Sequence, residues 1–375
     1  MHRHPDVITS LQTELYDWRL WSTRAVVLAF ASLAGLTVVA FTLLSEQALA
    51  AFHAMNVAAW WAPLLLTPAC TAAIVWCTHR YAPGARGHPF KLQPGSCTVR
   101  GADGIAVAFN TPLGGILFAI EELTRKPGQR SNGLVMAAIV LGGLMAVSVF
   151  VNSTYFGVIP SEKIGFSLLL PGLLVALACG LAGGLFSRLL IISLSGVSND
   201  WFSRMRKRSP IYFAAACGLV VAIIGLSTNG GTFGSGYTHT RAMLEGTDES
   251  TQLYVLLKFV ATWLSTWSGV PAGIFAPSLA IGGALGNDVA LWTGHAQSAT
   301  LIALGMAGFL AAVTQAPITA FVIVMEMVDG HGLVLSLMAC ALLASAVSRL
   351  VSAPLYASLA DLQLKRIPTD EAPKP

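Results

Sequence analysis

Charged side chains are scarce in this sequence. Asp, Glu, Lys and Arg together make up 11% of its 375 residues, while hydrophobic residues make up 55%. A soluble globular domain carries about 25% charged residues, so this chain lacks the polar side chains that would cover a water-exposed surface. Its mean hydropathy of +0.68 agrees with that conclusion. The composition excludes a soluble domain and predicts a protein embedded in lipid.

Cysteine pairs and metal-ligand clusters are also missing from the sequence. The six cysteines form no CxxC pattern and no paired spacing, and five of them lie in apolar runs, where cysteine behaves as a small hydrophobic residue. The sequence therefore predicts neither a disulfide framework nor a zinc site. His239 is a lone histidine with no cluster around it. We expect no metal and no cofactor.

Long apolar runs are what the chain has in abundance. They lie near 25–44, 58–78, 105–120, 133–151, 167–193, 211–226, 252–266, 274–292, 299–325 and 332–348. A transmembrane helix needs about 20 apolar residues, and several of these runs are shorter or are broken by Gly and Pro. We therefore expect an all-α polytopic membrane protein with roughly ten membrane segments, some of which are not full spans.

The basic residues gather in short polar stretches between the apolar runs. These clusters are Arg125, Lys126 and Arg130 in one stretch, and Arg204, Arg206, Lys207 and Arg208 in another. Short loops rich in Lys and Arg lie on the cytoplasmic side of membrane proteins, so both stretches are expected there. Nucleic-acid binding is the alternative for residues 204–208, but beside so much lipid-facing sequence we expect no nucleic-acid partner.

The two ends of the chain differ from its apolar middle. Residues 1–24 carry charges and aromatic side chains, and they lack the short apolar core and cleavage site of a signal peptide. We expect 1–24 to be a cytoplasmic or interfacial helical segment, 25–360 to be one transmembrane domain, and 361–375 to be a short tail.

An internal repeat becomes visible when Pro112 is set against Pro317. AVAFNTPLGGILFAIEEL (106–123) then lies over AAVTQAPITAFVIVMEMV (311–328), which pairs Asn110 with Gln315 and Glu121 with Glu326. Duplicated halves are common in transporters, whose sites lie where the halves meet. The expected repeats are about 25–155 and 165–360.

The first repeat is shorter than the second. The second half runs 77 residues from GSGYTHT, which begins at Gly234, to Ala311, whereas the first half runs only 19 from Gly87 to Ala106. The difference of 58 residues is room for two or three helices. In their place stands the polar, turn-like stretch HPFKLQPGSCTVRGADG (88–104). The first half is therefore expected to be truncated.

The stretch SGVPAGIFAPSLAIGG (268–283) places four glycines and two prolines in an apolar region. Irregular backbone at membrane depth persists only inside protein or beside a water-filled cavity. We interpret GVPAGIFAP as a loop that brings a helix N-terminus, starting near Ile274–Pro277, into the membrane interior. The amides of such an N-terminus bind anions. Close helix packing through small residues, or coordination of cations or organic substrates, are the alternatives.

Two further groups are candidates for an ion pathway. Glu121 and Glu122 end an apolar run, where a carboxylate either is solvated or paired with Arg125 or Lys126, or relays protons. Tyr356, in SAPLYASL, either anchors the chain at the membrane interface or offers a hydroxyl donor. These patterns alone leave both alternatives open.

Taken together, these motifs resemble the CLC family of chloride channels and chloride/proton exchangers. GVPAGIFAP is similar to the family's GxPGGIFAP segment, and GADGIAVAFNTPLGGILFAIEEL (101–123) is similar to the family's stretch that ends in paired glutamates. GSGYTHT, the element from Gln315 to Glu326 and the PLY near the C-terminus follow in the family's order. The resemblance covers most of 25–360.

The resemblance implies a fold, a function and site residues. It implies a homodimer of inverted-repeat subunits with broken and re-entrant helices, each subunit with its own pore, and an interface near 110–150 and 314–348. It implies chloride binding by the backbone amides of Ile274 and Phe275 and by the Tyr356 hydroxyl, and proton passage through Glu122. It also implies an integral protein of a bacterial inner membrane, with chloride and the lipid bilayer as partners.

One departure from the family is large. The family's first half carries GSGIP, whose serine binds chloride, and GREGP, whose glutamate gates the pore; neither motif occurs in this chain. We therefore expect chloride transport uncoupled from protons. The alternative is a transport-inactive remnant that still folds or dimerises. An intramembrane enzyme would need a nucleophile–base pair or a metal cluster on facing helices, and the sequence shows none, so no enzymatic activity is expected.

Overall fold

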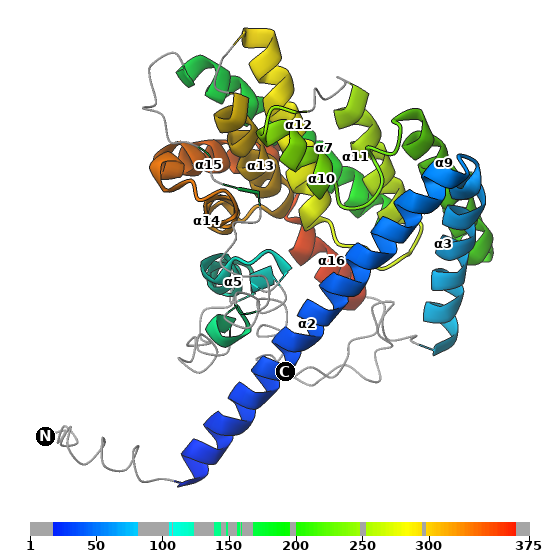
Figure 1. The fold of residues 1–375 in the computed structure, drawn as a ribbon, viewed down its shortest axis with the longest axis horizontal. Coiled ribbons are helices and arrows are strands. Elements are labelled where there is room, and N and C mark those ends of the chain that lie inside the picture. The colour runs from blue at the N-terminus through cyan, green and yellow to red at the C-terminus, as the bar shows by residue number, and fades with distance from the viewer. Residues whose placement is uncertain are drawn as a thin grey trace, which may run out of the picture. The chain divides into compact units, whose positions relative to one another are not determined.

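The computed structural model describes residues 18–81, 105–106, 108–123, 139–143, 148, 156–157, 159, 168–195, 200–247, 253–294 and 298–364. In these residues the regular structure is helical (Figure 1). The longer elements are α2 (Trp18–Ala58), α3 (Ala62–Tyr81), α7 (Leu169–Ser195), α9 (Pro210–Ser227), α11 (Leu253–Trp267), α12 (Phe275–Thr293), α13 (Ser298–Thr314), α14 (Pro317–Met327) and α15 (Val334–Val351). The shorter elements are α5 (Pro112–Phe118), η2 (Ala119–Leu123), α8 (Trp201–Arg208), α10 (Tyr237–Leu244), η4 (His331–Leu333) and α16 (Leu355–Leu364).

Five of the described helical segments are long and apolar enough to cross a membrane. They are Leu28–Ala58, Ala62–Tyr81, Leu169–Ser195, Pro210–Ser227 and His331–Val351. Pro112–Glu121, Leu253–Trp267, Ser298–Thr314 and Pro317–Met327 are apolar but shorter. The chain is thus an all-α polytopic membrane protein that combines full spans with shorter helices, as the sequence predicts.

Three predicted boundaries differ from the observed ones. The first apolar run belongs to a single helix, α2, which includes residues 18–24 and continues to Ala58, so no helix boundary falls at residue 24. The second run starts at Ala62 instead of near residue 58. The run 299–325 is two helices, α13 and α14, because Pro317 supplies no N–H to continue the first. Residues 1–17, 82–104 and 124–138 lie outside the described residues, as do the basic cluster at 125–130 and the tail beyond 364.

The described residues fall into two compact units. The first comprises Met1–Leu43 and Pro94–Ser153, and the second comprises Leu44–Gln93 and Thr154–Pro375. The second unit is organised around α13, in which every residue from Thr300 to Thr314 is buried. This helix packs against α7, α12, α14 and α15 (Figure 1). A helix that is apolar on all sides is expected to be surrounded in this way.

Small residues allow α12 and α13 to approach at backbone distance. Gly282 and Gly286 lie one turn apart on α12, and a Cβ at either position would overlap backbone atoms of α13, the carbonyl oxygen of Gly305 or of Leu301. Helices in lipid associate largely through such close van der Waals packing. The close-packing alternative for the glycines of 268–283 is therefore correct for Gly282, which lies C-terminal to the GVPAGIFAP loop, and Gly286 continues the same packing one turn further on.

The two stretches related by the internal repeat adopt the same local conformation. Asn110 and Gln315 both have left-handed backbones, with φ of 53° and 57°. The next residues, Thr111 and Ala316, have φ/ψ of −126°/77° and −117°/78°, and each precedes a helix that begins with proline. A left-handed conformation is uncommon for residues other than glycine. This coincidence supports the duplication, while the extent of each repeat stays a prediction.

Candidate functional site

The segment GVPAGIFAP forms an irregular loop that leads into α12. The loop leaves α11 at Trp267, turns at Gly269 with a φ of +91°, and ends at Ile274, the residue that caps α12. The Ser268 hydroxyl accepts a hydrogen bond from the Val270 N–H (3.3 Å) and supports the turn. The sequence prediction that a helix starts near Ile274–Pro277 is confirmed, since α12 begins at Phe275.

The start of α12 directs its first-turn amides out of the helix. The Ile274 carbonyl accepts hydrogen bonds from the backbone N–H (3.0 Å) and the hydroxyl (2.6 Å) of Ser278. The carbonyl of Ile274 thus takes part in the first helical hydrogen bond, whereas its N–H precedes the helix. The amides of a first turn carry partial positive charge. Residues 271–273 are exposed and residues 274–277 are half-buried, so the loop is open to a small ion. This arrangement can bind an anion.

Tyr356 lies at this same place in the fold. It is the second residue of α16, 81 positions after Phe275 in the chain, yet the two rings have centroids 6.3 Å apart. The structure thus brings together Ile274, Phe275 and Tyr356, three of the four residues that the sequence singled out. The Tyr356 phenol brings a neutral hydrogen-bond donor to this part of the fold.

A buried glutamine holds the segment that carries Tyr356. Gln315 is 3% exposed, and its side-chain amide donates to the Ser352 carbonyl (3.0 Å) in the link between α15 and α16. Arg349 donates to the Gln315 carbonyl (3.5 Å). Gln315 was identified only as a repeat-matched residue, and nothing in the sequence indicated that it would contact residue 352.

The GSGYTHT motif packs a second helix start against α12. Gly234 and Gly236 both have left-handed backbones, with φ of +66° and +90°. A Cβ on Gly236 would lie 2.5 Å from the Ala280 Cβ of α12, so only glycine fits both the turn and the close approach. Gly236 caps α10.

Lys258, which lies on the following helix α11, stabilises this glycine turn. Its side chain is 2% exposed, and its ammonium donates to the carbonyl oxygens of Thr232 and Gly234, both at 2.8 Å. Buried charge is costly unless it is hydrogen-bonded, and here two carbonyl dipoles satisfy it. Lys258 is not among the residues predicted for the site; its signal in the sequence is a single cation in the apolar run YVLLKFVATWL.

Replacing Lys258 by methionine is expected to destabilise the second unit by about 2 kcal/mol, because two buried carbonyls lose their donor. The midpoint of thermal unfolding of the detergent-solubilised chain should fall measurably. Leu256→Met, on the same helix but 59% exposed, is the matched control and should leave the midpoint unchanged. An unchanged midpoint in Lys258→Met would contradict a bracing role.

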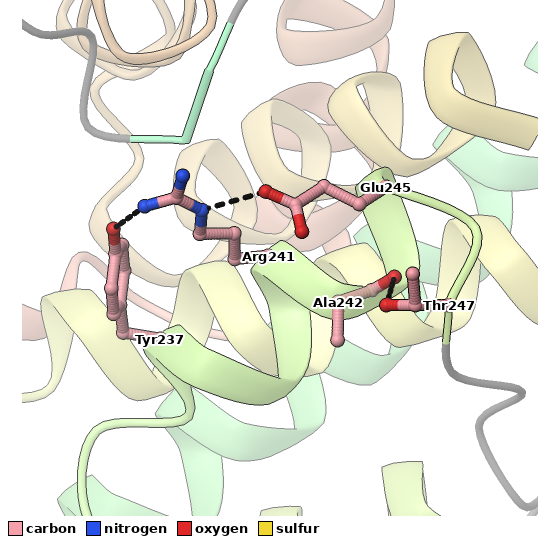
Figure 2. Close-up of polar contacts among 5 residues, drawn as sticks. All are labelled: Tyr237, Arg241, Ala242, Glu245 and Thr247. Atoms are coloured by element: carbon pink, nitrogen blue, oxygen red, sulfur yellow. Dashed lines mark hydrogen bonds and ion pairs between the residues drawn. The ribbon is translucent and has the colours of Figure 1, made fainter.

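Three side chains of α10 and its C-terminal cap are linked by hydrogen bonds on the exposed side of the helix. Figure 2 shows that Arg241 donates to the Glu245 carboxylate through Nε (2.8 Å) and to the Tyr237 hydroxyl through Nη1 (3.0 Å). Arg241 and Glu245 are each about half exposed, so their ion pair contributes at most about 1 kcal/mol. The Tyr237 ring also packs against Phe156, with ring centroids 5.3 Å apart. These contacts tie Tyr237, in the middle of GSGYTHT, to the part of α10 that follows the motif.

Glu122 belongs to the first compact unit and not to the unit that holds Ile274, Phe275 and Tyr356. It lies in η2, a π-helical turn that follows α5 directly. Single π-helical turns often occur at functional sites. The proton role of Glu122 stays a prediction.

Three comparisons place the chain among known proteins. A family model described as "Voltage gated chloride channel" matches residues 97–349. The H(+)/Cl(-) exchange transporter ClcA of Citrobacter koseri is 29% identical over 290 residues, and that of Salmonella typhimurium is 28% identical. These alignments cover 73% of this chain but only 59% of either relative, so the chain matches less than two thirds of their length.

Solved structures share the fold at lower sequence identity. A CLC-type fluoride/proton antiporter superposes with a TM-score of 0.71 at 17% identity, over 91% of this chain and 98% of the other. A slow cyanobacterial Cl-/H+ antiporter superposes with a TM-score of 0.69 at 21% identity, over 92% and 97%. At these identities the likeness concerns the fold alone, and it confirms the predicted fold class.

Proposed function

Because this chain belongs to the voltage-gated chloride channel family, we propose that it moves chloride across a membrane through a site built from α12 and α16. The observation that carries the proposal is the meeting of the α12 N-terminus, at Ile274 and Phe275, with Tyr356. The relatives are named as exchange transporters, which supports transport and not enzymatic activity. Their bacterial sources support a place in the inner membrane.

The chemistry of the proposed site suits a permeating halide. Amide N–H groups and a phenol hydroxyl bind an anion without a full positive charge, so the ion enters readily and also leaves. A lysine or arginine at the same place would hold the ion more tightly. Lys258, a buried cation of this unit, is instead held by the carbonyls of Thr232 and Gly234.

The central experiment is chloride efflux from liposomes that contain the purified 375-residue chain. We expect efflux above that of empty liposomes. Liposomes loaded with sulfate in place of chloride are the control for general leakage and should release little. Efflux equal to that of empty liposomes, from a protein shown to be folded, would overturn the proposal.

Coupling to protons is expected to be absent. Neither GSGIP nor GREGP occurs in the sequence, and the resemblance assigns gating and proton hand-over to the glutamate of the second motif. A chloride gradient imposed on these liposomes should therefore drive no uphill proton movement, as measured with an internal pH dye. Glu122→Gln should leave chloride efflux within about twofold of wild type, because one proton relay cannot couple without its partner. Uphill proton transport driven by chloride would sink the uncoupled assignment.

A transport-inactive remnant is the second candidate. The observation that favours it is the same loss of GSGIP, since that motif supplies the family's first-half chloride ligand. Under this proposal the chain folds and forms a homodimer through the helices near 110–150 and 314–348 without conducting. Crosslinking in the membrane tests the dimer, and the efflux assay above separates this candidate from the first.

A further inference from the structure

α8 joins two candidate spans and presents basic side chains at the membrane surface. α7 ends at Ser195 and α9 begins at Pro210, so the connection that contains α8 lies where these two spans leave the membrane. From residue 200 to residue 212 the sequence holds four basic side chains and one acidic side chain, Asp200. α8 therefore brings a local positive charge to the lipid headgroup level.

The exposed face of α8 combines cations with an aromatic ring. Trp201, Arg204 and Arg208 are exposed and lie at i, i+3 and i+7, on one side of the helix. The opposite side carries the buried Ser203 (8% exposed). Tyr212, at the start of α9, adds a second exposed ring at the same level (74% exposed). Trp and Tyr at this level insert their rings among lipid headgroups.

Specific contacts fix the orientation of this face. The half-buried Arg206 donates through Nη1 to the Ser193 carbonyl at the end of α7 (3.0 Å), and the Trp263 indole donates to the Ser193 hydroxyl (3.0 Å). Phe202 packs against Trp267, with ring centroids 6.1 Å apart. Arg206 thus serves as an anchor, while Arg204 and Arg208 are exposed on the other side of the helix.

We propose that the exposed face of α8, formed by Arg204 and Arg208 beside Trp201 with the exposed Lys207 at its edge, binds the phosphate headgroups of anionic phospholipids. Arginine matches phosphate oxygens with two parallel N–H donors, and clustered basic residues next to a span attract anionic lipid. The exposed rings favour a lipid over a free phosphate ion, because a soluble ion gains nothing from an aromatic side chain buried in the interface. The proposal is independent of the chloride site.

The test uses the full chain in a neutral detergent and fluorescently labelled phosphatidylglycerol, with labelled phosphatidylcholine as the neutral comparison. We expect the wild type to prefer phosphatidylglycerol. The triple variant Arg204→Gln/Lys207→Gln/Arg208→Gln should lose about tenfold or more in affinity for phosphatidylglycerol, and little for phosphatidylcholine. Arg80→Gln, which removes an exposed cation at the end of α3, is the matched control and should change either affinity less than about twofold.

Two outcomes would overturn the proposal. One is a folded triple variant with unchanged affinity for phosphatidylglycerol. The other is inorganic phosphate displacing the lipid at an equal phosphate concentration, which would show that a free anion site and not a lipid surface is present. Should the triple variant fail to fold, salt decides on the wild type: a preference for phosphatidylglycerol that fades between low and high salt supports the proposal, and a salt-independent preference overturns it.

Discussion

Chloride efflux should fall about tenfold or more when Ile274 is replaced by proline. Proline removes one N–H from the proposed anion site, and a hydrogen bond to a charged group contributes about 1.5–3 kcal/mol. The backbone has to adjust, because Ile274 has a φ of −100°, about 35° from the value that proline fixes. The residue before it is Gly273, on which proline imposes the least restriction. The measurement is the initial rate of efflux from liposomes that contain equal amounts of folded protein.

The matched control for this prediction is Ile274→Val. Valine keeps the N–H and most of the apolar volume, so efflux should stay within about twofold of wild type. Tyr356→Phe removes only the hydroxyl from the other side of the site and should lower efflux by about three- to tenfold. Wild-type efflux in Ile274→Pro would rule out the Ile274 amide as part of the pathway, whatever the result with Tyr356.

Replacing Gly286 by valine is expected to prevent normal folding of the second unit. A Cβ at this position would overlap the backbone carbonyl of Leu301 on α13, and a backbone atom cannot rotate away as a side chain can. Overpacking in a core costs up to about 3 kcal/mol, and more where the backbone must move. Because α13 is the buried centre of this unit, separating it from α12 disturbs the whole core. We expect little folded protein in size-exclusion chromatography, and a lower thermal midpoint for what remains.

Gly172→Ala is the control for added volume in a glycine-rich helix. A Cβ there would lie 3.6 Å from the Leu304 side chain, an ordinary van der Waals contact, and alanine also favours the helix. This variant should fold with a midpoint equal to or above that of wild type. Normal folding of Gly286→Val would mean that α12 and α13 do not pack at backbone distance.

The two predictions separate local chemistry from architecture. Ile274→Pro should remove transport from a folded protein, whereas Gly286→Val should remove the fold itself. Both positions belong to the stretch from Ser268 to Gly283 and its continuation on α12, in which the sequence analysis left open whether the glycines serve binding or packing. In the structure, Gly269 forms a turn before the helix, while Gly282 and Gly286 contact α13. The same residue type thus shapes the loop at one point and packs two helices a few turns later.

Much of the architecture could be predicted from the sequence, because its causes are local. Membrane burial follows from the scarcity of charge, and the start of α12 follows from the Gly and Pro residues before it. The pairing of Asn110 with Gln315 predicts a duplication, and the left-handed φ of both residues supports it. The resemblance to the CLC family rests on the same short motifs, and the family match confirms it.

Other features depend on contacts between distant residues, which no local pattern encodes. Three contacts join segments that are far apart in the chain. Phe275 meets Tyr356, Gln315 bonds to Ser352, and Lys258 bonds to the glycine turn. The apolar run that ends near residue 44 also underestimates the length of α2, which continues to Ala58. Polar residues such as Glu46 and Gln47 do not end a helix, because the backbone hydrogen bonds continue through them. The sequence by itself determined that the protein is embedded in lipid, that it is helical, and which residues are candidates for the anion site. Tertiary packing alone decided which of those residues lie together. Hydrophobicity and helix signals act over a few residues, whereas the site is formed by helices that are many tens of residues apart in the chain.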